Sequence, residues 1–177
     1  AYERTASAAA EPVAYPQVWL QPLPEGEPFA ADPASPYNRT PDWSADGWLS
    51  YYDPGKAGFV AFNPDSGEQQ LFPNETGEPG DWSPQAPHFI APEILLIENG
   101  YLIPGGDLAP LPASHLMRFE RGSANRQDLS IADVYEDVSP AVSPDGNLLA
   151  FARKYLDPQR WTPGRQLWVM ELATQVS

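Results

Sequence analysis

The stretch AVSPDG at residues 141–146 decides the fold, because altered copies of it occur twice more in the chain. They read PDWSADG at residues 41–47 and GDWSP at residues 80–84. Recurrence at a spacing of tens of residues is typical of a repeat architecture, in which each unit stacks on its neighbours to bury its apolar face. Each copy follows an apolar run at a similar interval: 24 residues from Trp19 to Trp43, 22 from Val60 to Trp82, and 25 from Met117 to Val142.

The repeated segment has the composition of a tight turn. In residues 143–146, Pro presets φ for the second turn position, Asp suits the third, and Gly takes the left-handed conformation that leads into the next strand. The copy at 44–47 keeps Asp and Gly but lacks Pro. The copy at 83–86 keeps Pro alone, so we expect a looser or longer turn there. Turn formation accounts for these residues without any ligand.

Short apolar runs separated by turn residues predict antiparallel strands, and the first full repeat reads as a four-stranded meander. In the second repeat, Asn99-Gly100 between apolar runs predicts a type I′ hairpin. The expected strands are residues 18–23, a segment around Phe29, a strand ending at Trp43, 48–52, 58–62, 70–72, 88–91, 94–97, 102–103, 115–119, 128–130, 148–153 and 166–172.

Composition excludes several structural classes. The 22 prolines and 13 glycines among 177 residues disfavour long helices, because Pro removes a backbone donor and clashes inside a helix. Six Trp, eight Tyr and seven Phe disfavour disorder. No run approaches the roughly 18–20 apolar residues that cross a bilayer. With 42% hydrophobic residues, the chain can build a packed core.

The formal charge of −14 makes nucleic acid and anionic lipid poor partners, since both are negatively charged. Solubility alone accounts for this charge, and a basic partner or a bound cation is the alternative. The absence of cysteine excludes disulfides, thiolate metal sites and a cysteine nucleophile.

We find no pattern of a catalytic or metal site. The chain lacks the glycine-any-serine-any-glycine elbow of serine hydrolases. His88 and His115 lie 27 residues apart among apolar neighbours, so we expect satisfied histidines at strand edges and no zinc site. The acidic residues at 133–137 offer oxygen ligands for calcium but lack the glycine spacing of a calcium loop, and a solvated loop is the favoured interpretation. We predict no cofactor and no metal. Asn38 and Asn74 match the glycosylation pattern.

One basic and aromatic cluster stands out on the acidic chain. A loop at residues 155–164 carries Trp161, and Lys154, Arg160 and Arg165 lie close to it in sequence, together with Arg153. Trp and Arg are the usual anchors of protein interfaces. We therefore predict that Trp161, Arg160, Arg165 and Lys154 contact a protein partner. The alternative is that Trp161 folds back onto its own strands.

Residues 143–153 followed by 167–174 resemble the PD40 repeat of TolB-like β-propellers. In that family a blade runs from tryptophan-serine-proline-aspartate-glycine into an apolar strand, a loop, a strand that ends in an acidic residue, and an outer strand. Residues 41–72 match this pattern well, and residues 82–130 match at their ends. The resemblance covers residues 18–174 and implies an all-β fold, a partial β-propeller with about three to three and a half four-stranded antiparallel blades.

The resemblance also implies a domain organisation. Residues 17–177 form the propeller segment, and residues 1–16, which are small, polar and contain proline, are expected to form an N-terminal arm or linker. Propellers close with about 4–8 blades, which removes long open edges. We therefore expect a segment of a longer polypeptide, or a second chain that completes the ring. The expected parts are a half-blade at 17–40, a blade at 41–80, a blade with an insertion at 81–138 and an incomplete blade at 139–177.

The resemblance defines the function less closely than the fold, because one fold serves many functions. The leading hypothesis is a noncatalytic interaction or scaffold module, a subunit or fragment of a larger bacterial assembly in the periplasm or on the cell surface. Its partner would be a protein or further copies of the chain, with no nucleic acid and no membrane insertion of this segment. One alternative is the gating propeller of a prolyl-oligopeptidase-type serine peptidase whose catalytic domain lies outside this chain. The other is a propeller that binds a carbohydrate or small ligand.

Overall fold

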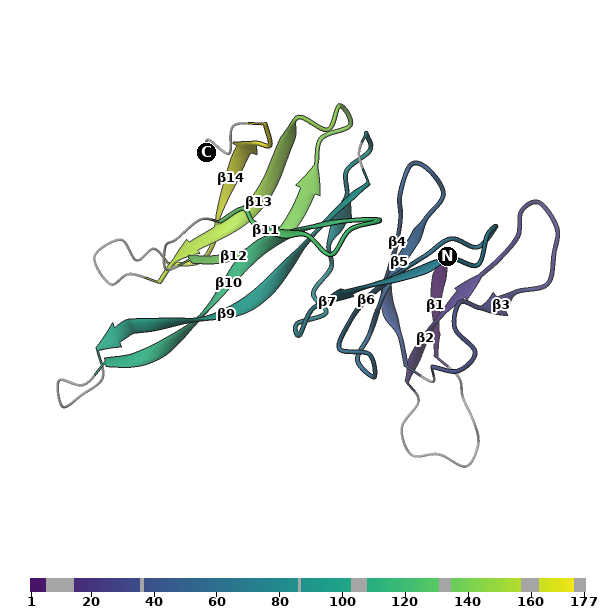
Figure 1. The fold of residues 1–177 in the computed structure, drawn as a ribbon, viewed down its shortest axis with the longest axis horizontal. Helices are drawn as coiled ribbons and strands as arrows, with labels where there is room; N and C mark the ends of the chain where they lie inside the picture. The colour runs from purple at the N-terminus through teal and green to yellow at the C-terminus, as the bar shows by residue number, and fades with distance from the viewer. Residues whose placement is uncertain are drawn as a thin grey trace. The chain divides into compact units, whose positions relative to one another are not determined.

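The computed structural model describes residues 1–5, 15–35, 37–85, 87–102, 108–130, 135–156 and 163–173. The chain divides into two compact units, Ala1–Gly77 and Glu78–Ser177. Within the described residues all regular structure is β-strand (Figure 1), which confirms the all-β class. No described segment is a helix that could span a membrane.

A three-stranded antiparallel sheet opens the first unit. Strand β1 (Tyr2–Thr5) pairs with β2 (Pro16–Leu20), and β2 pairs with β3 (Phe29–Ala30). Strand β1 lies in the part of the chain for which the sequence predicts an arm or linker. It has one large apolar side chain, that of Tyr2, so no hydrophobic period marks it as a strand.

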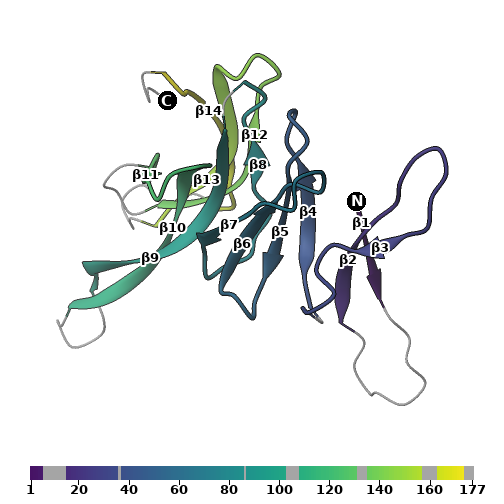
Figure 2. The same ribbon diagram turned by 45° about the vertical axis from the view of Figure 1, so that its right-hand side comes forward.

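A four-stranded antiparallel meander follows in the same unit, and all four strands were expected from the sequence. The strands pair in chain order, as Figures 1 and 2 show. They are β4 (Arg39–Trp43), β5 (Leu49–Asp53), β6 (Gly58–Phe62) and β7 (Gln69–Pro73).

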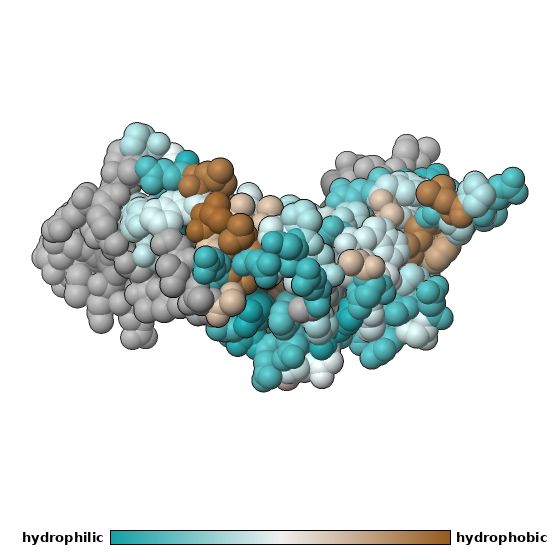
Figure 3. Space-filling model, turned by 90° about the horizontal axis from the view of Figure 1, so that it is seen from above, coloured by the Kyte–Doolittle hydropathy of each residue, from teal (hydrophilic) through white to brown (hydrophobic). Residues whose placement is uncertain are grey.

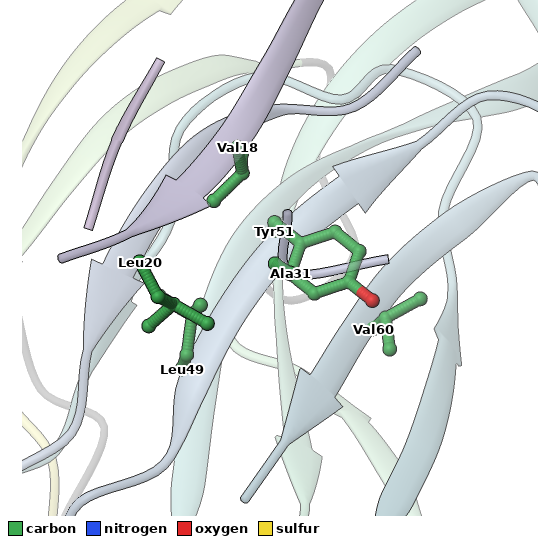
Figure 4. Close-up of a cluster of buried hydrophobic side chains, with 6 residues drawn as sticks. All are labelled: Val18, Leu20, Ala31, Leu49, Tyr51 and Val60. Carbon is green, nitrogen blue, oxygen red and sulfur yellow. The ribbon is translucent and has the colours of Figure 1, made fainter. Parts of the chain in front are cut away.

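The core of the first unit lies between these two sheets. Val18, Leu20 and Ala31 from the three-stranded sheet and its flank pack against Leu49, Tyr51 and Val60 of the meander (Figure 4). Every residue of β5 is buried. Since burying one large apolar side chain stabilises a fold by about 1.5–3 kcal/mol, this layer is the main support of the unit.

The second unit contains two more antiparallel meanders. Four strands pair in order from β8 to β11, and three pair in order from β12 to β14. One parallel pair, Ser114 with Glu136, joins the meanders into a single sheet. The strands are β8 (Asp81–Trp82), β9 (His88–Leu102), β10 (Leu108–Glu120), β11 (Arg126–Asp128), β12 (Tyr135–Val142), β13 (Leu148–Tyr155) and β14 (Gln166–Glu171).

The hairpin predicted at Asn99-Gly100 is wrong. Both residues belong to β9, which continues to Leu102 and pairs with β10. Ile97 pairs with Leu111 and Tyr101 with Ala109, so three residues of β9 stand opposite Pro110 alone. The Asn-Gly pair therefore lies in a β-bulge, because Pro110 has no N–H with which to continue the ladder.

The repeated turn has the predicted conformation in the first and third copies. Gly47 and Gly146 have φ of 85° and 72°, in the left-handed region. In both copies the serine hydroxyl donates to the aspartate two residues on and accepts an N–H where the next strand begins, from Trp48 directly before β5 and from Leu148 at the start of β13. In the second copy the N–H of Ser83 donates to the carbonyl of His88 across five residues. The third copy spans the same interval, whereas in the first copy the N–H of Ser44 donates to the carbonyl of Trp48, so the second turn is longer than the first and as long as the third.

The core of the second unit lies where its two meanders face each other. Ile90, Leu116 and Leu129 of the four-stranded meander and its flank cluster with Leu149, Phe151 and Met170 of the three-stranded one. Stacked antiparallel meanders with a core between them are the arrangement of propeller blades. The fold is thus all-β and has the form of a partial β-propeller.

Candidate interaction surface

The residues predicted for protein contact fall in two groups. Trp161 and Arg160 lie outside the described residues. Lys154 lies near the end of β13, and Arg165 directly precedes β14. The structure therefore places one of the four predicted residues on β13 and a second directly before the neighbouring strand β14.

Lys154 and Arg165 share a sheet face with an acidic residue. Lys154 pairs in register with Glu136 of β12. An Nη2 group of Arg165 donates to Oε1 of the same Glu136, and both side chains are partly exposed. Because exposed ion pairs contribute roughly 0–1 kcal/mol, this group sets the local charge pattern more than the stability of the sheet.

Next to these charges the same sheet exposes an apolar face. Strand residues alternate between faces, so Leu148, Ala150 and Ala152 of β13 share one face with Leu167 and Val169 of β14. We call these five residues the β13–β14 face. Leu167 is 79% exposed, Val169 50% and Leu148 39%. Figure 3 shows hydrophobic residues interrupting a largely hydrophilic surface on one side of the molecule.

The opposite face of the same strands is buried, which explains why the strands form where they do. Leu149, Phe151 and Met170 alternate with the exposed residues and point into the core. Alternation of this kind fixes the register, since a slip by one residue would exchange the two faces. Leucine and valine on the exposed side are therefore not needed for the core of the described unit.

A buried ion pair stands at the same end of the sheet as Lys154. Nε and Nη2 of Arg153 donate to the two carboxylate oxygens of Asp137 at 2.8 and 2.7 Å. Asp137 is fully buried and Arg153 is 4% exposed. Burial works against the charge of Arg153, but the hydrogen bonds and the charge of Asp137 outweigh it and raise the pKa of the guanidinium. This pair corrects two expectations: Asp137 is not in a solvated loop, and Arg153 is not part of a surface cluster.

Aromatic rings and hydroxyl groups complete the surroundings of this ion pair. The guanidinium of Arg153 lies 3.8 Å from the ring centroid of Tyr135 and 5.2 Å from that of Trp168. The hydroxyl of Ser130 donates to Asp137 at 2.6 Å, and the hydroxyl of Ser114 donates to its carbonyl. These bonds link the three-stranded meander to the four-stranded one. No sequence pattern predicts these hydrogen bonds, because their partners are 7 to 23 residues apart in the chain.

Both histidines lie in strands of the second unit and have neighbouring charged side chains of the same chain. His115 is 2% exposed, and its Nδ1 lies 2.7 Å from Oδ2 of Asp128. Burial lowers the pKa of His88, and the charge of Arg118 acts in the same direction. Among the described residues no group of three or more acidic or histidine side chains is arranged to hold a metal ion. Of the acidic residues considered for calcium, Asp133 lies outside the described residues, and Glu136 and Asp137 bind arginines.

An open pocket of about 300 Å³ occurs in the first unit, lined by a loop after β3 and the turn after β5. Nζ of Lys56 lies 2.7 Å from Oδ2 of Asp32 and 3.6 Å from Oδ2 of Asp53. Burial raises the pKa of Asp32, but the bonds from Lys56 and from backbone N–H groups prevail, so its pKa is lowered. The charged groups are thus paired within the chain.

The two glycosylation patterns lie on buried side chains. Asn38 is fully buried, and its Oδ1 accepts the N–H of Val18 at 2.5 Å. Asn74 is 1% exposed, and its Oδ1 accepts the N–H groups of Thr76 and Gly77. Both asparagines stabilise their loops in the folded chain, where a glycan has no access to them.

Comparison with known proteins gives a limited result. No family model matches the chain, and no curated protein matches it. Among solved structures, TolB from Acinetobacter baumannii is similar with a TM-score of 0.36 and 12% sequence identity, over 91% of this chain and 47% of that chain. The chain therefore spans about half the length of that TolB structure. A likeness this low transfers neither function nor residue roles.

Proposed function

We propose that this chain is a noncatalytic protein-interaction module whose β13–β14 face docks on another protein chain. The observation that carries the proposal is the exposure of Leu148, Leu167 and Val169 side by side on one sheet face. Contiguous exposed apolar residues mark interaction sites on soluble proteins, whereas scattered ones do not.

The rim of the face supports the same proposal. Lys154, Glu136 and Arg165 border its apolar centre with charges of both signs. An apolar centre inside a polar rim is the usual anatomy of a protein interface. The proposal includes Arg165 and Lys154 in the contact, together with Trp161 and Arg160, which lie outside the described residues.

We further propose that the module belongs to a larger extracytoplasmic assembly of a bacterium, as a subunit or as a fragment of a longer chain. The resemblance of residues 143–153 and 167–174 to TolB-like repeats supports this placement. The blade limits at 41–80, 81–138 and 139–177 are part of the same proposal.

The test is the mass of the native assembly, measured by sedimentation of the protein prepared from its source. Leu167→Glu should release the chain from the assembly without changing its thermal unfolding, since the side chain is 79% exposed. Leu23→Glu is the matched control, because Leu23 is 85% exposed and lies in the other unit. Equal loss of assembly in both variants, or in neither, would reject the β13–β14 face as the contact.

A further inference from the structure

We infer that the open pocket of the first unit, at Asp32 and Asp53, binds a guanidinium group from outside the chain, as an arginine side chain presents it. The inference goes beyond the proposed function, since the β13–β14 face belongs to the other unit. It rests on the internal repeat, because in the second unit a guanidinium of the chain itself fills the equivalent position.

The first two strands of the meanders β4–β7 and β12–β14 correspond residue by residue. In both, the first strand has a register shift shortly before the repeated turn. A non-glycine residue in the left-handed region lies in each shift, Thr40 with φ of 53° and Ser139 with φ of 55°. The strand pairs just beyond the shift are therefore equivalent: Arg39 with Tyr52, and Val138 with Ala152.

The next pair of positions differs in charge between the two units. In the second unit it is Asp137 with Arg153, which pair in register and make two hydrogen bonds of 2.8 and 2.7 Å. In the first unit the same positions hold Asn38 and Asp53. All four residues are buried. An amide thus stands where the second unit has a carboxylate, and a carboxylate stands where it has a guanidinium.

A third equivalent position adds another carboxylate to the first unit. The chain before each meander makes one matching backbone hydrogen bond of 2.9 Å, from the N–H of Ala31 to Val18 and from that of Leu129 to Leu116. The residue that follows is Asp32 in the first unit and Ser130 in the second. At these three positions the second unit has one carboxylate and one guanidinium, and the first unit has two carboxylates.

The first unit has space for a cation at this place. Asp32 and Asp53 line the pocket of about 300 Å³ together with Ser35 and Lys56. Sites for small ligands begin at about this volume. In the second unit the buried side chain of Arg153 stands at the equivalent place. The pocket therefore combines the charge and the room that an arginine side chain requires.

A buried hydroxyl without a partner lies near the two carboxylates. Tyr51 lies on the same side of β5 as Asp53, and its ring packs with Ala31, the residue before Asp32 (Figure 4). Its hydroxyl has no hydrogen-bond partner among the described residues. Burial raises the pKa of Tyr51, and the charges of both carboxylates add to this effect. The equivalent residue of the second unit is Phe151, whose ring centroid lies 4.9 Å from the guanidinium there.

Lys56 is the cation that holds the pocket in the free chain. Its Nζ lies 2.7 Å from Oδ2 of Asp32 but 3.6 Å from Oδ2 of Asp53, which is longer than a hydrogen bond. One ammonium between two carboxylates leaves one negative charge in excess. Because the Lys56 side chain is 39% exposed, it can turn to solvent while a guanidinium, with its rigid fork of donors, bonds to the carboxylates.

The experiment titrates the peptide acetyl-glycyl-arginyl-glycine amide into the purified chain and follows the backbone amides by NMR. We expect a dissociation constant of about 1 mM, since a single side chain makes few contacts. The signals of Ala34 and Gly55 should move, because their N–H groups donate to Asp32 and Asp53. The same peptide with lysine, or with citrulline as a neutral isostere of arginine, should bind at least about tenfold more weakly.

Two substitutions should change the affinity in opposite directions. Asp53→Asn keeps the oxygen that accepts the N–H of Gly55 but removes the charge, so binding should weaken about tenfold. Lys56→Gln removes the competing ammonium, so binding should strengthen by about the same factor. Lys154→Gln is the matched control, because it makes the same change in net charge in the other unit, and it should leave binding unchanged. Thermal unfolding checks that each variant is folded.

Free arginine, titrated in the same way, identifies the source of the guanidinium. Tighter binding of the peptide favours a protein partner, and tighter binding of free arginine favours a small solute. Both results support the site.

Several results would overturn the inference. These are equal binding of the arginine, lysine and citrulline peptides, or unmoved signals of Ala34 and Gly55 in both the original chain and Lys56→Gln. Calcium that shifts the same signals and displaces the peptide would also overturn it, since the pocket would then be a metal site. None of these results affects the assembly test of the β13–β14 face, which lies in the other unit.

Discussion

The meanders β4–β7 and β12–β14 share the same turn between their first two strands but bury and expose their strands differently. In the first, all of β5 is buried and the core is formed by aliphatic residues and Tyr51. In the second, β14 buries Met170 and exposes Leu167 and Val169, and a buried ion pair stands beside the core. The repeated motif thus determines the backbone, whereas the residues outside it determine whether a strand is buried on both faces or exposes an apolar face.

The largest difference between the meanders should appear when the ion pair is broken. Asp137→Ala leaves the guanidinium of Arg153 buried without its carboxylate, and we expect a loss of about 3–5 kcal/mol in the free energy of unfolding. Denaturant titration measures it. Replacing both residues, as in Asp137→Leu with Arg153→Met, should cost less than Asp137→Ala alone. A larger loss in the double variant would show that the charges themselves stabilise the second unit.

The next effect concerns the first unit. Gly77 has φ of 60°, and a β-carbon there would lie 2.4 Å from the ring of Tyr52. Gly77→Ala should therefore lower the free energy of unfolding by about 2–4 kcal/mol, from overpacking and backbone strain together. Gly122→Ala is the control, because Gly122 has φ of 81° but open space around it, and strain alone costs about 1 kcal/mol. Equal losses would mean that the ring of Tyr52 moves aside.

A smaller effect should follow from the hydroxyl of Tyr51. It is buried and has no hydrogen-bond partner among the described residues, so Tyr51→Phe should stabilise the chain by about 1 kcal/mol. No comparable group is found among the described residues of β12–β14. Thermal unfolding at neutral pH measures the change, and a destabilised variant would reveal a bond to the hydroxyl.

The same hydroxyl predicts a dependence on pH. Burial raises the pKa of Tyr51, with smaller contributions from Asp32 and Asp53, so the folded chain holds the proton after the unfolded chain has lost it. The titration of Tyr51 therefore leaves the free energy of unfolding unchanged below pH 10.0 and lowers it as pH rises above that value. The alkaline decline of the denaturation midpoint should be shallower in Tyr51→Phe. Identical declines would mean that other groups cause it.

Much of the backbone was predictable because short-range chemistry defines it. Strands β5 to β7 follow from short apolar runs separated by turn residues, and Gly47 and Gly146 adopt the conformation that their motif requires. The prediction at Asn99-Gly100 was wrong for the same reason. A short-range pattern cannot tell a turn from a bulge when the deciding residue, Pro110, lies on the partner strand.

The candidate surface was predictable in part. Lys154 and Arg165 were predicted as contact residues because they are charged and lie near an aromatic residue in the sequence. The structure brings both to Glu136. Arg153 belongs to the same run of sequence but lies in the interior, where it donates hydrogen bonds to Asp137. The exposure of Leu167 was not predictable, because an apolar residue in a strand is normally assigned to the core. Whether a second layer covers that side depends on the whole fold.

The most direct test of the interaction surface uses the absence of cysteine from the chain. A single cysteine introduced as Leu167→Cys or as Leu23→Cys can be alkylated with a maleimide, first in the dilute purified chain and then in the native assembly. We expect both positions to react quickly in the dilute chain and Leu167→Cys to react much more slowly in the assembly. Equal reaction rates at the two positions in the assembly would contradict a binding role for the β13–β14 face.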